Sequence, residues 1–240
     1  MLRYQRSRLE ALVDSINASG YGLTFGVHTR LDETVRYVTD RIRAGNIYVN
    51  RNIVGAVVGV QPFGGEGLSG TGPKAGGGLP VQGPVGGQAG VITLPGPTGE
   101  SNTYHLKPRG TVLCLAHTEH GIRAQHEACR RTGNRMLIID TPAGKAFHEA
   151  GEATEARLAA AEDIANSDFQ AVLFEGDGDE LRALNQEVAR RDGPSVPVQG
   201  LGRDELAAGA RYAMETLVRE VSLSINTAAA GGNASLMMIG

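Results

Sequence analysis

The stretch that decides the fold is "GTVLCLAHTEHGIRAQHEACRRTGNRMLIID", residues 110–140. Its two ends, residues 110–116 and 135–140, are short apolar runs, and residues 121–133 between them carry apolar side chains at helical spacing. A strand, a helix and a second strand within about thirty residues form the repeating unit of parallel sheets. The stretch therefore predicts a parallel sheet covered by helices.

The same alternation continues toward the C-terminus. Because short apolar strands alternate with helices there, the fold class predicted for residues 100–240 is α/β, a doubly wound and Rossmann-like sheet with helices on both faces. The further predicted helices are 144–167, 179–193 and 203–221, and the further predicted strands are 170–175 and 196–200.

Residues 1–77 predict a smaller α/β part, with helices over 1–19 and 30–45 and strands over 22–29 and 46–50. Between residues 75 and 99 the chain has no charged and no aromatic residue, while glycine and proline recur. Such a segment buries too little apolar surface to offset its ordering entropy. We therefore expect a linker over residues 78–99 and a separate domain over 100–240.

The composition excludes several kinds of partner. The 240 residues are 41% hydrophobic, and 23 basic against 26 acidic residues give a net charge of -3, so no strong field attracts nucleic acid or anionic lipid. Two cysteines are too few for a disulfide framework, and we find no signal peptide and no membrane anchor. We expect a cytoplasmic protein.

Gly65, Gly67 and Gly70 match the Gly-x-Gly-x-x-Gly pattern of dinucleotide-binding turns. That fingerprint requires a helix directly after the glycines and an acidic residue about twenty positions later. No helix is predicted here, and the next acidic residue after Glu66 is Glu100. We interpret these glycines as shaping a loop rather than holding phosphates.

The two ends of the chain share a weak internal similarity. An ungapped alignment that places Asn50 on Asn226 pairs Ile47 with Leu223 and Val49 with Ile225. Chance agreement between glycine-rich segments is the alternative. Our interpretation is that both parts end in the same order of strand, helix, strand and loop.

Cys114, His117 and His120 have the spacing Cys-x-x-His-x-x-His, which raises the possibility of a metal site that Cys129 or His126 would complete. However, Cys114 lies within an apolar predicted strand, where a free thiol behaves as a small hydrophobic group. Neither cysteine lies in a motif typical of a nucleophile. We therefore predict no metal ligand and no catalytic residue, and we interpret "EGDGDE", residues 175–180, as a turn that caps the next helix.

Longer motifs resemble a known family. "AGNIYVNRNIVGAVVGVQPFGGEGLSGTGPKAGG", residues 44–77, resembles the end of an aldehyde dehydrogenase catalytic domain, that of the glutamate semialdehyde (pyrroline-carboxylate) dehydrogenase half of bifunctional proline utilization A. Residues 94–116, "LPGPTGESNTYHLKPRGTVLCLA", and 224–240, "SINTAAAGGNASLMMIG", resemble the extra C-terminal domain of the longer members. Residues 78–91 look like a shortened or an engineered form of the family's connection.

The resemblance implies where a substrate would bind. The loop around Gly55 and Ala56 would be the aldehyde anchor loop, whose backbone amides would bind the carboxylate of glutamate semialdehyde, and Phe63 would line the aldehyde pocket. From the residues alone, a plain tight turn and core packing of Phe63 are the alternatives. The family's catalytic cysteine, oxyanion-hole asparagine and cofactor-binding glutamate would precede residue 1, so we expect no catalytic or cofactor-binding residue here and no activity from this chain alone.

The resemblance also implies cofactors and partners. The parent enzyme would oxidise proline with FAD and then glutamate semialdehyde with NAD, and this chain would act with the missing N-terminal part of the same polypeptide, in a possible homo-oligomer. For the second domain we expect a structural role, with its apolar tail as a lid or interface. The alternatives are a nucleotide-binding domain and an interaction module without enzymatic function.

Overall fold

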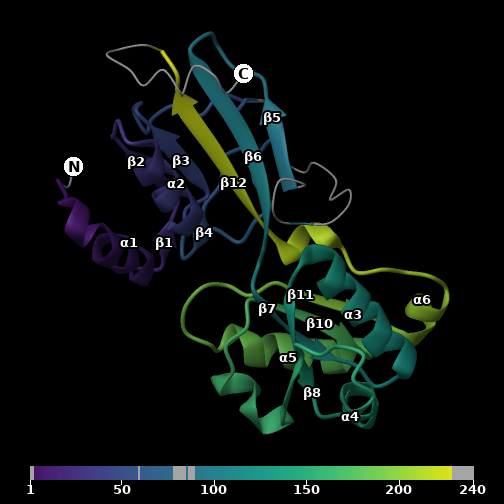
Figure 1. The fold of residues 1–240 in the computed structure, drawn as a ribbon. Helices are drawn as coiled ribbons and strands as arrows, with labels where there is room; N and C mark the ends of the chain where they lie inside the picture. The colour runs from purple at the N-terminus through teal and green to yellow at the C-terminus, as the bar shows by residue number, and fades with distance from the viewer. Residues whose placement is uncertain (1–2, 59, 78–84, 86–89, 229–240) are drawn as a thin grey trace. The chain divides into compact units, whose positions relative to one another are not determined.

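The computed structural model describes residues 3–58, 60–77, 85 and 90–228, which fold into two compact units that alternate along the sequence (Figure 1). Of the described residues, the first unit takes 3–58, 60–77, 91–105 and 220–228. The second unit takes residues 85, 90 and 106–219.

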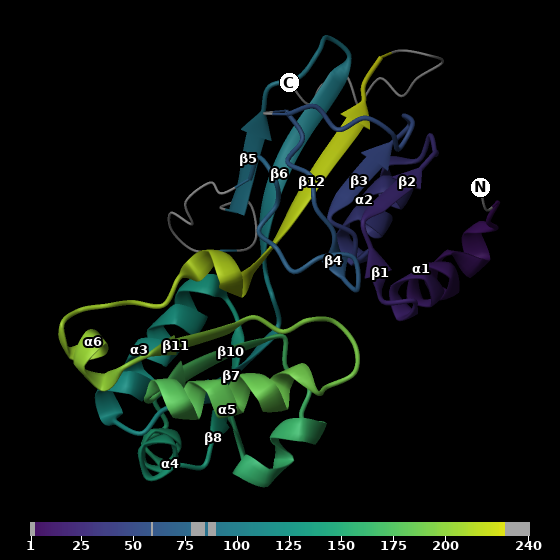
Figure 2. The same ribbon diagram turned by 180° about the vertical axis from the view of Figure 1, so that it is seen from behind.

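The first unit is built on a five-stranded sheet with the strand order β2-β3-β12-β6-β5, whose strands lie side by side in Figure 2. β2, β3 and β12 are parallel neighbours, whereas β5 and β6 pair antiparallel. A separate antiparallel pair joins β1 to β4. The strands are β1 (Tyr21–Gly22), β2 (Thr24–Val27), β3 (Asn46–Val49), β4 (Glu66–Gly67), β5 (Val91–Leu94), β6 (Glu100–Pro108) and β12 (Val218–Asn226).

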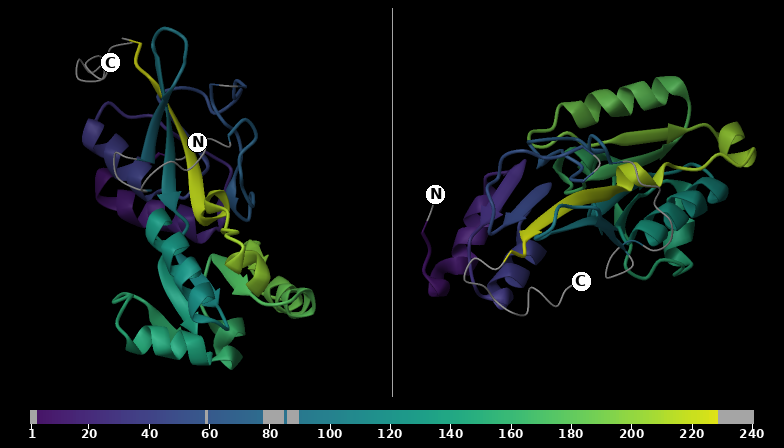
Figure 3. Two further views of the ribbon diagram at one scale, coloured as in Figure 1. Left: turned by 90° about the vertical axis from the view of Figure 1, so that its right-hand side faces the viewer. Right: turned by 90° about the horizontal axis from the view of Figure 1, so that it is seen from above.

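Two helices cover one face of this sheet. A short 3-10 turn, η1 (Arg6–Arg8), precedes α1 (Leu9–Ala18), and α2 (Asp32–Arg41) connects β2 to β3. Val13 of α1 and Val38 of α2 pack against Ile47 of β3 and Val221 of β12 in one buried cluster. Both helices therefore lie on the same side of the sheet, as the purple and blue segments of Figure 3 show.

The second unit confirms the predicted α/β fold. Its five strands have the order β11-β10-β7-β8-β9, and every neighbouring pair is parallel. The strands are β7 (Thr111–Leu115), β8 (Arg135–Ile139), β9 (Arg157–Ala159), β10 (Ala171–Glu175) and β11 (Val198–Leu201); the helices are α3 (Glu119–Thr132), α4 (Pro142–Glu149), η3 (Ala161–Asn166), α5 (Gly178–Ala189), α6 (Arg203–Ala207) and η4 (Met214–Leu217).

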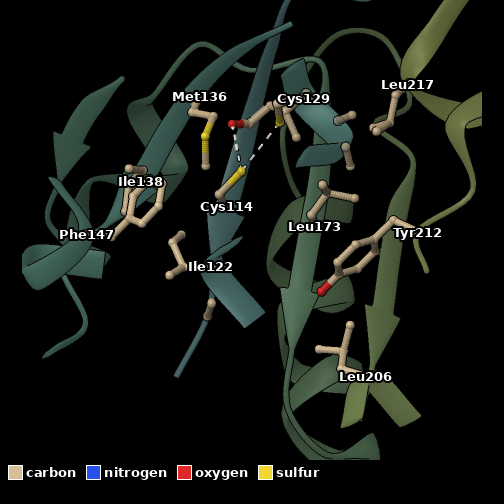
Figure 4. Close-up of a cluster of buried hydrophobic side chains, with 14 residues drawn as sticks. Cys114, Ile122, Cys129, Met136, Ile138, Phe147, Leu173, Leu206, Tyr212 and Leu217 are labelled. Atoms are coloured by element: carbon tan, nitrogen blue, oxygen red, sulfur yellow. Dashed lines mark hydrogen bonds between the residues drawn. The ribbon is translucent and has the colours of Figure 1, made fainter. Parts of the chain in front are cut away.

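Alternate residues of these strands face two separate cores, as expected for a sheet with helices on both faces. Cys114 and Leu173 point into the cluster shown in Figure 4, which α3 and α4 cover. Leu113 and Val172 point into the opposite cluster, which contains Leu184 of α5.

Two of the predicted helices are wrong. The segment 144–167 contains the end of α4, then β9 and η3, and the segment 203–221 contains the five-residue α6, then η4 and the start of β12. In each case a glycine with positive φ follows the helix, Gly151 at 70° and Gly209 at 95°. Glycine adopts this left-handed conformation readily and ends helices there.

The predicted domain boundaries are also wrong in part. Residues 91–94 of the expected linker form β5, while residues 78–84 and 86–89 lie outside the described residues. Residues 100–105 and 220–228 lie within the predicted second domain, yet they belong to the first unit. The helical periodicity assigned to 203–221 hid the start of β12, in which Val221, Ser222 and Ser224 are buried.

The internal similarity acquires a different interpretation. Ile47 and Leu223, like Val49 and Ile225, are register partners in the parallel pair of β3 and β12. The similar segments are therefore neighbouring strands of one sheet and not the ends of two separate sheets. The remaining aligned positions of the tail, residues 229–240, lie outside the described residues.

We expect β3 to lose its protection when β12 is removed, because β3 lies between β2 and β12 in the sheet. Deleting residues 220–240 should raise hydrogen exchange at Ile47 and Val49 by at least tenfold, while Val112 and Leu113 of β7 stay protected. Mass spectrometry of exchanged peptides measures both regions.

The control deletes only residues 229–240 and leaves β12 intact. Equal exchange at β3 in the two truncated chains would contradict a central role for β12 in the first sheet.

Candidate functional site: a backbone loop after strand β3

The candidate site is the loop of residues 50–63, which begins directly after the buried strand β3. Asn50 has φ 56° and is the one non-glycine residue with positive φ among those the structure describes. Its side chain accepts a hydrogen bond from the Thr29 N–H at 2.9 Å and donates to the Thr29 carbonyl at 3.0 Å. These bonds favour the turn, since asparagine tolerates this conformation better than most residues.

Two successive backbone amides in the loop have no internal partner. The Val54 N–H donates to Asn52 Oδ1 at 3.3 Å, and the Val57 N–H donates to Gln61 Oε1 at 3.0 Å. Within the described part of the chain, the N–H groups of Gly55 and Ala56, between these two, donate to no group. Gly55 has φ 85°, and no atom lies within 4 Å of the position that a Cβ would take. Both amides are thus available to an acceptor from outside.

The side chains of the loop are apolar and largely exposed. Val54 is 75% exposed and Val58 is 93% exposed. Phe63 is 37% exposed, so it is not a core residue, and core packing does not explain it. A loop with an apolar surface and free amides suits a ligand that has both an aliphatic part and an anionic end.

The end of the loop is held through the carbonyl of Pro62, the residue before Phe63. This carbonyl accepts from Asn46 Nδ2 at 3.0 Å and from Ser222 Oγ at 2.6 Å, with Lys74 Nζ at 3.4 Å. Phe63 itself exchanges two backbone hydrogen bonds of 3.0 Å with Ala75. The backbone at Phe63 is therefore held in place by the hydrogen bonds of the Pro62 carbonyl and by those between Phe63 and Ala75.

Lys74 is a buried cation beneath this end of the loop. Its Nζ donates to Asn46 Oδ1 at 2.8 Å and to the Gly45 carbonyl, and the Glu220 carboxylate accepts from the backbone N–H of Lys74 and from the Tyr104 hydroxyl. Burial lowers the pKa of Lys74 to about 8, although Glu220 opposes part of this shift. The charged amine is costly here because it has lost its water.

Residues 2–80 match the model of the aldehyde dehydrogenase family. The whole chain aligns with the bifunctional protein PutA of Rhizobium meliloti, at 45% identity over 287 positions that cover 23% of that protein. The chain is therefore similar along its whole length to part of a PutA protein, and residues 2–80 match the aldehyde dehydrogenase family model.

Two further relatives agree with this assignment. A probable delta-1-pyrroline-5-carboxylate dehydrogenase of Schizosaccharomyces pombe is 47% identical over 79 residues, 32% of this chain and 14% of that protein. The structure of proline utilization A from Corynebacterium freiburgense matches with a TM-score of 0.57 at 21% identity, over 94% of this chain and 25% of that one, which supports the fold. The chain thus spans about a quarter or less of these relatives' length.

The structure brings the residues predicted from the sequence, Gly55, Ala56 and Phe63, into this one exposed loop. Their binding role stays a prediction. Sequence reasoning missed Asn50 and Gln61, which hold the loop. The available signal was an asparagine directly after a buried strand and a single polar side chain between Val60 and Pro62.

The glycine pattern at residues 65–70 has a structural explanation. A Cβ on Gly65 would lie 2.4 Å from the Ser69 carbonyl oxygen, and a Cβ on Gly70 would lie 2.6 Å from the Gly65 carbonyl oxygen. Gly67 has φ 64°, and a Cβ on it would lie 2.3 Å from the Gly20 carbonyl oxygen. Close backbone approach accounts for all three glycines, since no other residue has so little volume at these positions.

The two cysteines and two of the nearby histidines, His117 and His120, contact other protein groups. Cys114 and Cys129 are buried with their sulfur atoms 3.8 Å apart, and burial raises the pKa of the Cys114 thiol. His120 Nε2 lies 3.2 Å from the Leu206 carbonyl, and the His117 ring packs edge-on against Phe174. In the described ranges, no three potential ligands gather for a metal, and no helix is long and apolar enough to span a membrane.

A Rossmann-like sheet raises the question of a nucleotide, whose phosphates would bind where β7 leads into α3. Here the buried Glu175 carboxylate occupies that position. It accepts from the backbone N–H groups of His117 and Thr118 at 2.8 and 2.9 Å, and from the Thr118 hydroxyl at 2.7 Å. A Cβ on Gly121 would lie 2.2 Å from it. A pyrophosphate does not fit at this position. The backbone N–H groups that would bind it already donate to Glu175, and the negative charge of that carboxylate would repel it.

We expect Glu175→Ala to lower the free energy of unfolding by about 2–4 kcal/mol, because three partly buried donors lose a buried acceptor. Urea unfolding followed by circular dichroism measures the change. Glu180→Ala is the control, since Glu180 is an exposed member of the α5 capping box and should cost about 1 kcal/mol or less. Equal costs for the two variants would contradict a buried structural role for Glu175.

Lys74 predicts a pH dependence. A basic group whose pKa falls from 10.5 to about 8 on folding binds fewer protons in the folded state between these values, so the stability that depends on it rises with pH there. The free energy of unfolding of the unmodified chain should therefore rise relative to Lys74→Met by about 2–3 kcal/mol between pH 8 and 10.5. Denaturant unfolding across this range tests it; a constant difference would show that the amine titrates normally.

Proposed function

We propose that the loop of residues 50–63 binds the carboxylate end of an aldehyde substrate. The N–H groups of Gly55 and Ala56 donate to the carboxylate, and Phe63 packs on the aliphatic part of the molecule. The observation that carries this proposal is the pair of free amides between two amides that are held within the loop.

The chemistry of the loop suits an anion. Hydrogen bonds from backbone N–H groups to a carboxylate are charge-assisted and stronger than those between neutral groups. Gly55 places no side chain over the amides, so an oxygen atom can approach them closely. Binding the carboxylate at a fixed distance from the aldehyde would orient the reacting carbon toward catalytic groups outside this chain.

The reaction we propose for the whole enzyme is the NAD-dependent oxidation of L-glutamate gamma-semialdehyde to L-glutamate, following FAD-dependent oxidation of proline. The names of the PutA and pyrroline-5-carboxylate dehydrogenase relatives support it. We propose that this chain holds neither the nucleophile nor the NAD site and is inactive alone. Both of its cysteines are buried, and Glu175 fills the phosphate position of the second unit.

For the second unit we propose a structural role in the cytoplasmic enzyme, as a lid or as part of an oligomer interface. The lid would be formed by the apolar tail of residues 229–240, which follows β12 of the first sheet in the sequence and lies outside the described residues. An interaction module without enzymatic partners is the alternative. Restoration of dehydrogenase activity by this chain would argue against it.

We expect Gly55→Val to weaken binding of the semialdehyde selectively. The test enzyme is a chimera of the Rhizobium meliloti PutA in which this chain replaces the matching segment. The variant should raise KM for glutamate semialdehyde at least tenfold, because a β-branched side chain is strained at φ 85° and covers the amides. KM for pentanal, which has no carboxylate, should change less than twofold.

Gly76→Val is the matched control. Gly76 has φ 70°, and no atom lies within 4 Å of its Cβ position, so the backbone strain is similar but no side chain is added between the amides of Gly55 and Ala56. A folded chimera that does not oxidise glutamate semialdehyde, or equal effects of the two variants on KM, would contradict the proposed function.

A further inference from the structure

We propose that Glu100 and Asn102 of β6 are positioning residues for the substrate loop and that they act through Gln61. This inference rests on the proposed function of the loop and adds to it a role for residues that follow the glycine-rich segment. It assigns to the polar cluster of Arg51, Gln61, Glu100, Asn102 and Ser224 the task of fixing where the free amides of the loop lie.

Gln61 is the link between the loop and the sheet. Its Oε1 accepts from the Val57 N–H at 3.0 Å, the amide directly after that of Ala56. Its Nε2 donates to Glu100 Oε1 at 2.6 Å and to Asn102 Oδ1 at 3.2 Å. Gln61 is 3% exposed, so water does not compete for these bonds. The side-chain amide of Gln61 thus connects the loop backbone at Val57 to two residues of β6.

Glu100 holds both ends of the loop. Its second oxygen, Oε2, accepts from Arg51 Nη1 at 2.5 Å, and Arg51 is the second residue of the loop. Both side chains of this ion pair are 15% exposed, and the Arg51 guanidinium also lies 5.1 Å from the centre of the Tyr48 ring. The carboxylate therefore joins the start of the loop at Arg51 to its end at Gln61.

Asn102 connects the cluster to the rest of the sheet. Its Nδ2 donates to Glu100 Oε1 at 2.9 Å, and its Oδ1 accepts from Ser224 Oγ of β12 at 2.5 Å. Ser224 is the register partner of Tyr48 in β3, the strand that leads into the loop. The cluster thus closes a ring of contacts from β3 through the loop to β6 and back through β12.

The loop needs these hydrogen bonds because its own side chains make few packing contacts. Ile53, Val54, Val57 and Val58 are each 47% or more exposed, so few packing contacts fix the backbone between Arg51 and Gln61. A loop that must be ordered on binding loses affinity, whereas a loop held in its binding geometry does not. The cluster therefore sets the affinity for the carboxylate without touching the substrate.

Gln61→Met tests the inference in the chimeric enzyme because it keeps the side-chain length and removes all three hydrogen bonds. We expect KM for glutamate semialdehyde to rise about five- to tenfold, the loss of roughly one net hydrogen bond, with kcat and the KM for pentanal changed less than twofold. Glu100→Gln, a milder change, should shift KM in the same direction by about threefold. In the double variant the two effects should not add, since both act through one contact.

Gln125→Met is the matched control, because Gln125 is an equally buried glutamine of the second unit that donates to the Leu115 carbonyl at 2.9 Å and to the Tyr212 hydroxyl at 3.2 Å. It should leave the KM ratio of the two aldehydes unchanged. In the unfused chain, amide exchange at Val57 should rise at least fivefold in both Gln61→Met and Glu100→Gln and stay constant in Gln125→Met.

The outcomes separate the two proposals. A raised KM ratio in Gly55→Val without one in Gln61→Met and Glu100→Gln would overturn the positioning role alone. An unchanged ratio in all three variants would overturn the proposed function, and the positioning role with it. A raised ratio in all three that is accompanied by faster exchange at Val57 in the cluster variants is the expected result.

Discussion

The first unit depends on the pairing of β3 with β12, strands that are far apart in the sequence and adjacent in the sheet. β3 is fully buried in this pairing, and two buried serines of β12 bond near the loop: Ser222 donates to the Pro62 carbonyl and Ser224 to Asn102 Oδ1. A loop after a parallel strand is commonly held by the strands beside it, and here one of those strands comes from the last part of the described chain. The strand β12 consequently stabilises both the sheet and the loop of the candidate site.

This arrangement explains why polar residues lie in the interior of the first unit. Asn46, Gln61, Lys74, Asn102, Ser222 and Ser224 are all buried, and each forms hydrogen bonds with the loop or with its supports. Buried polar groups are costly unless they are satisfied, but a satisfied network fixes one geometry more sharply than apolar packing does. For a loop that presents backbone amides, a fixed geometry is the property that matters most.

The α/β class and the strands of the second unit could be predicted from the sequence, because β7, β8 and β10 are continuous apolar runs buried on both faces. The breaks at Gly151 and Gly209 could not, since a glycine within helical periodicity is compatible with either a continuous helix or a left-handed end. β6 and the start of β12 were missed for a related reason. Their buried positions include Asn102, Ser222 and Ser224, whose polarity conceals the alternation that identifies a strand.

In the candidate site, too, the residues of the loop could be identified from the local sequence, whereas their partners on β6 could not. Glycine at position 55 and the polar side chain at position 61 can be read from the sequence, and residues 44–77, which contain the loop, resemble aldehyde dehydrogenases. The partners of that loop are Glu100 and Asn102, beyond a segment without charge, and no local pattern connects them to Gln61. A carboxylate that satisfies both Arg51 and Gln61 is nevertheless what the loop requires, because a partly buried guanidinium and a buried amide each need an acceptor. The need for an acceptor could therefore be predicted from the loop once its burial was known, whereas the strand that supplies it could be found only from the fold.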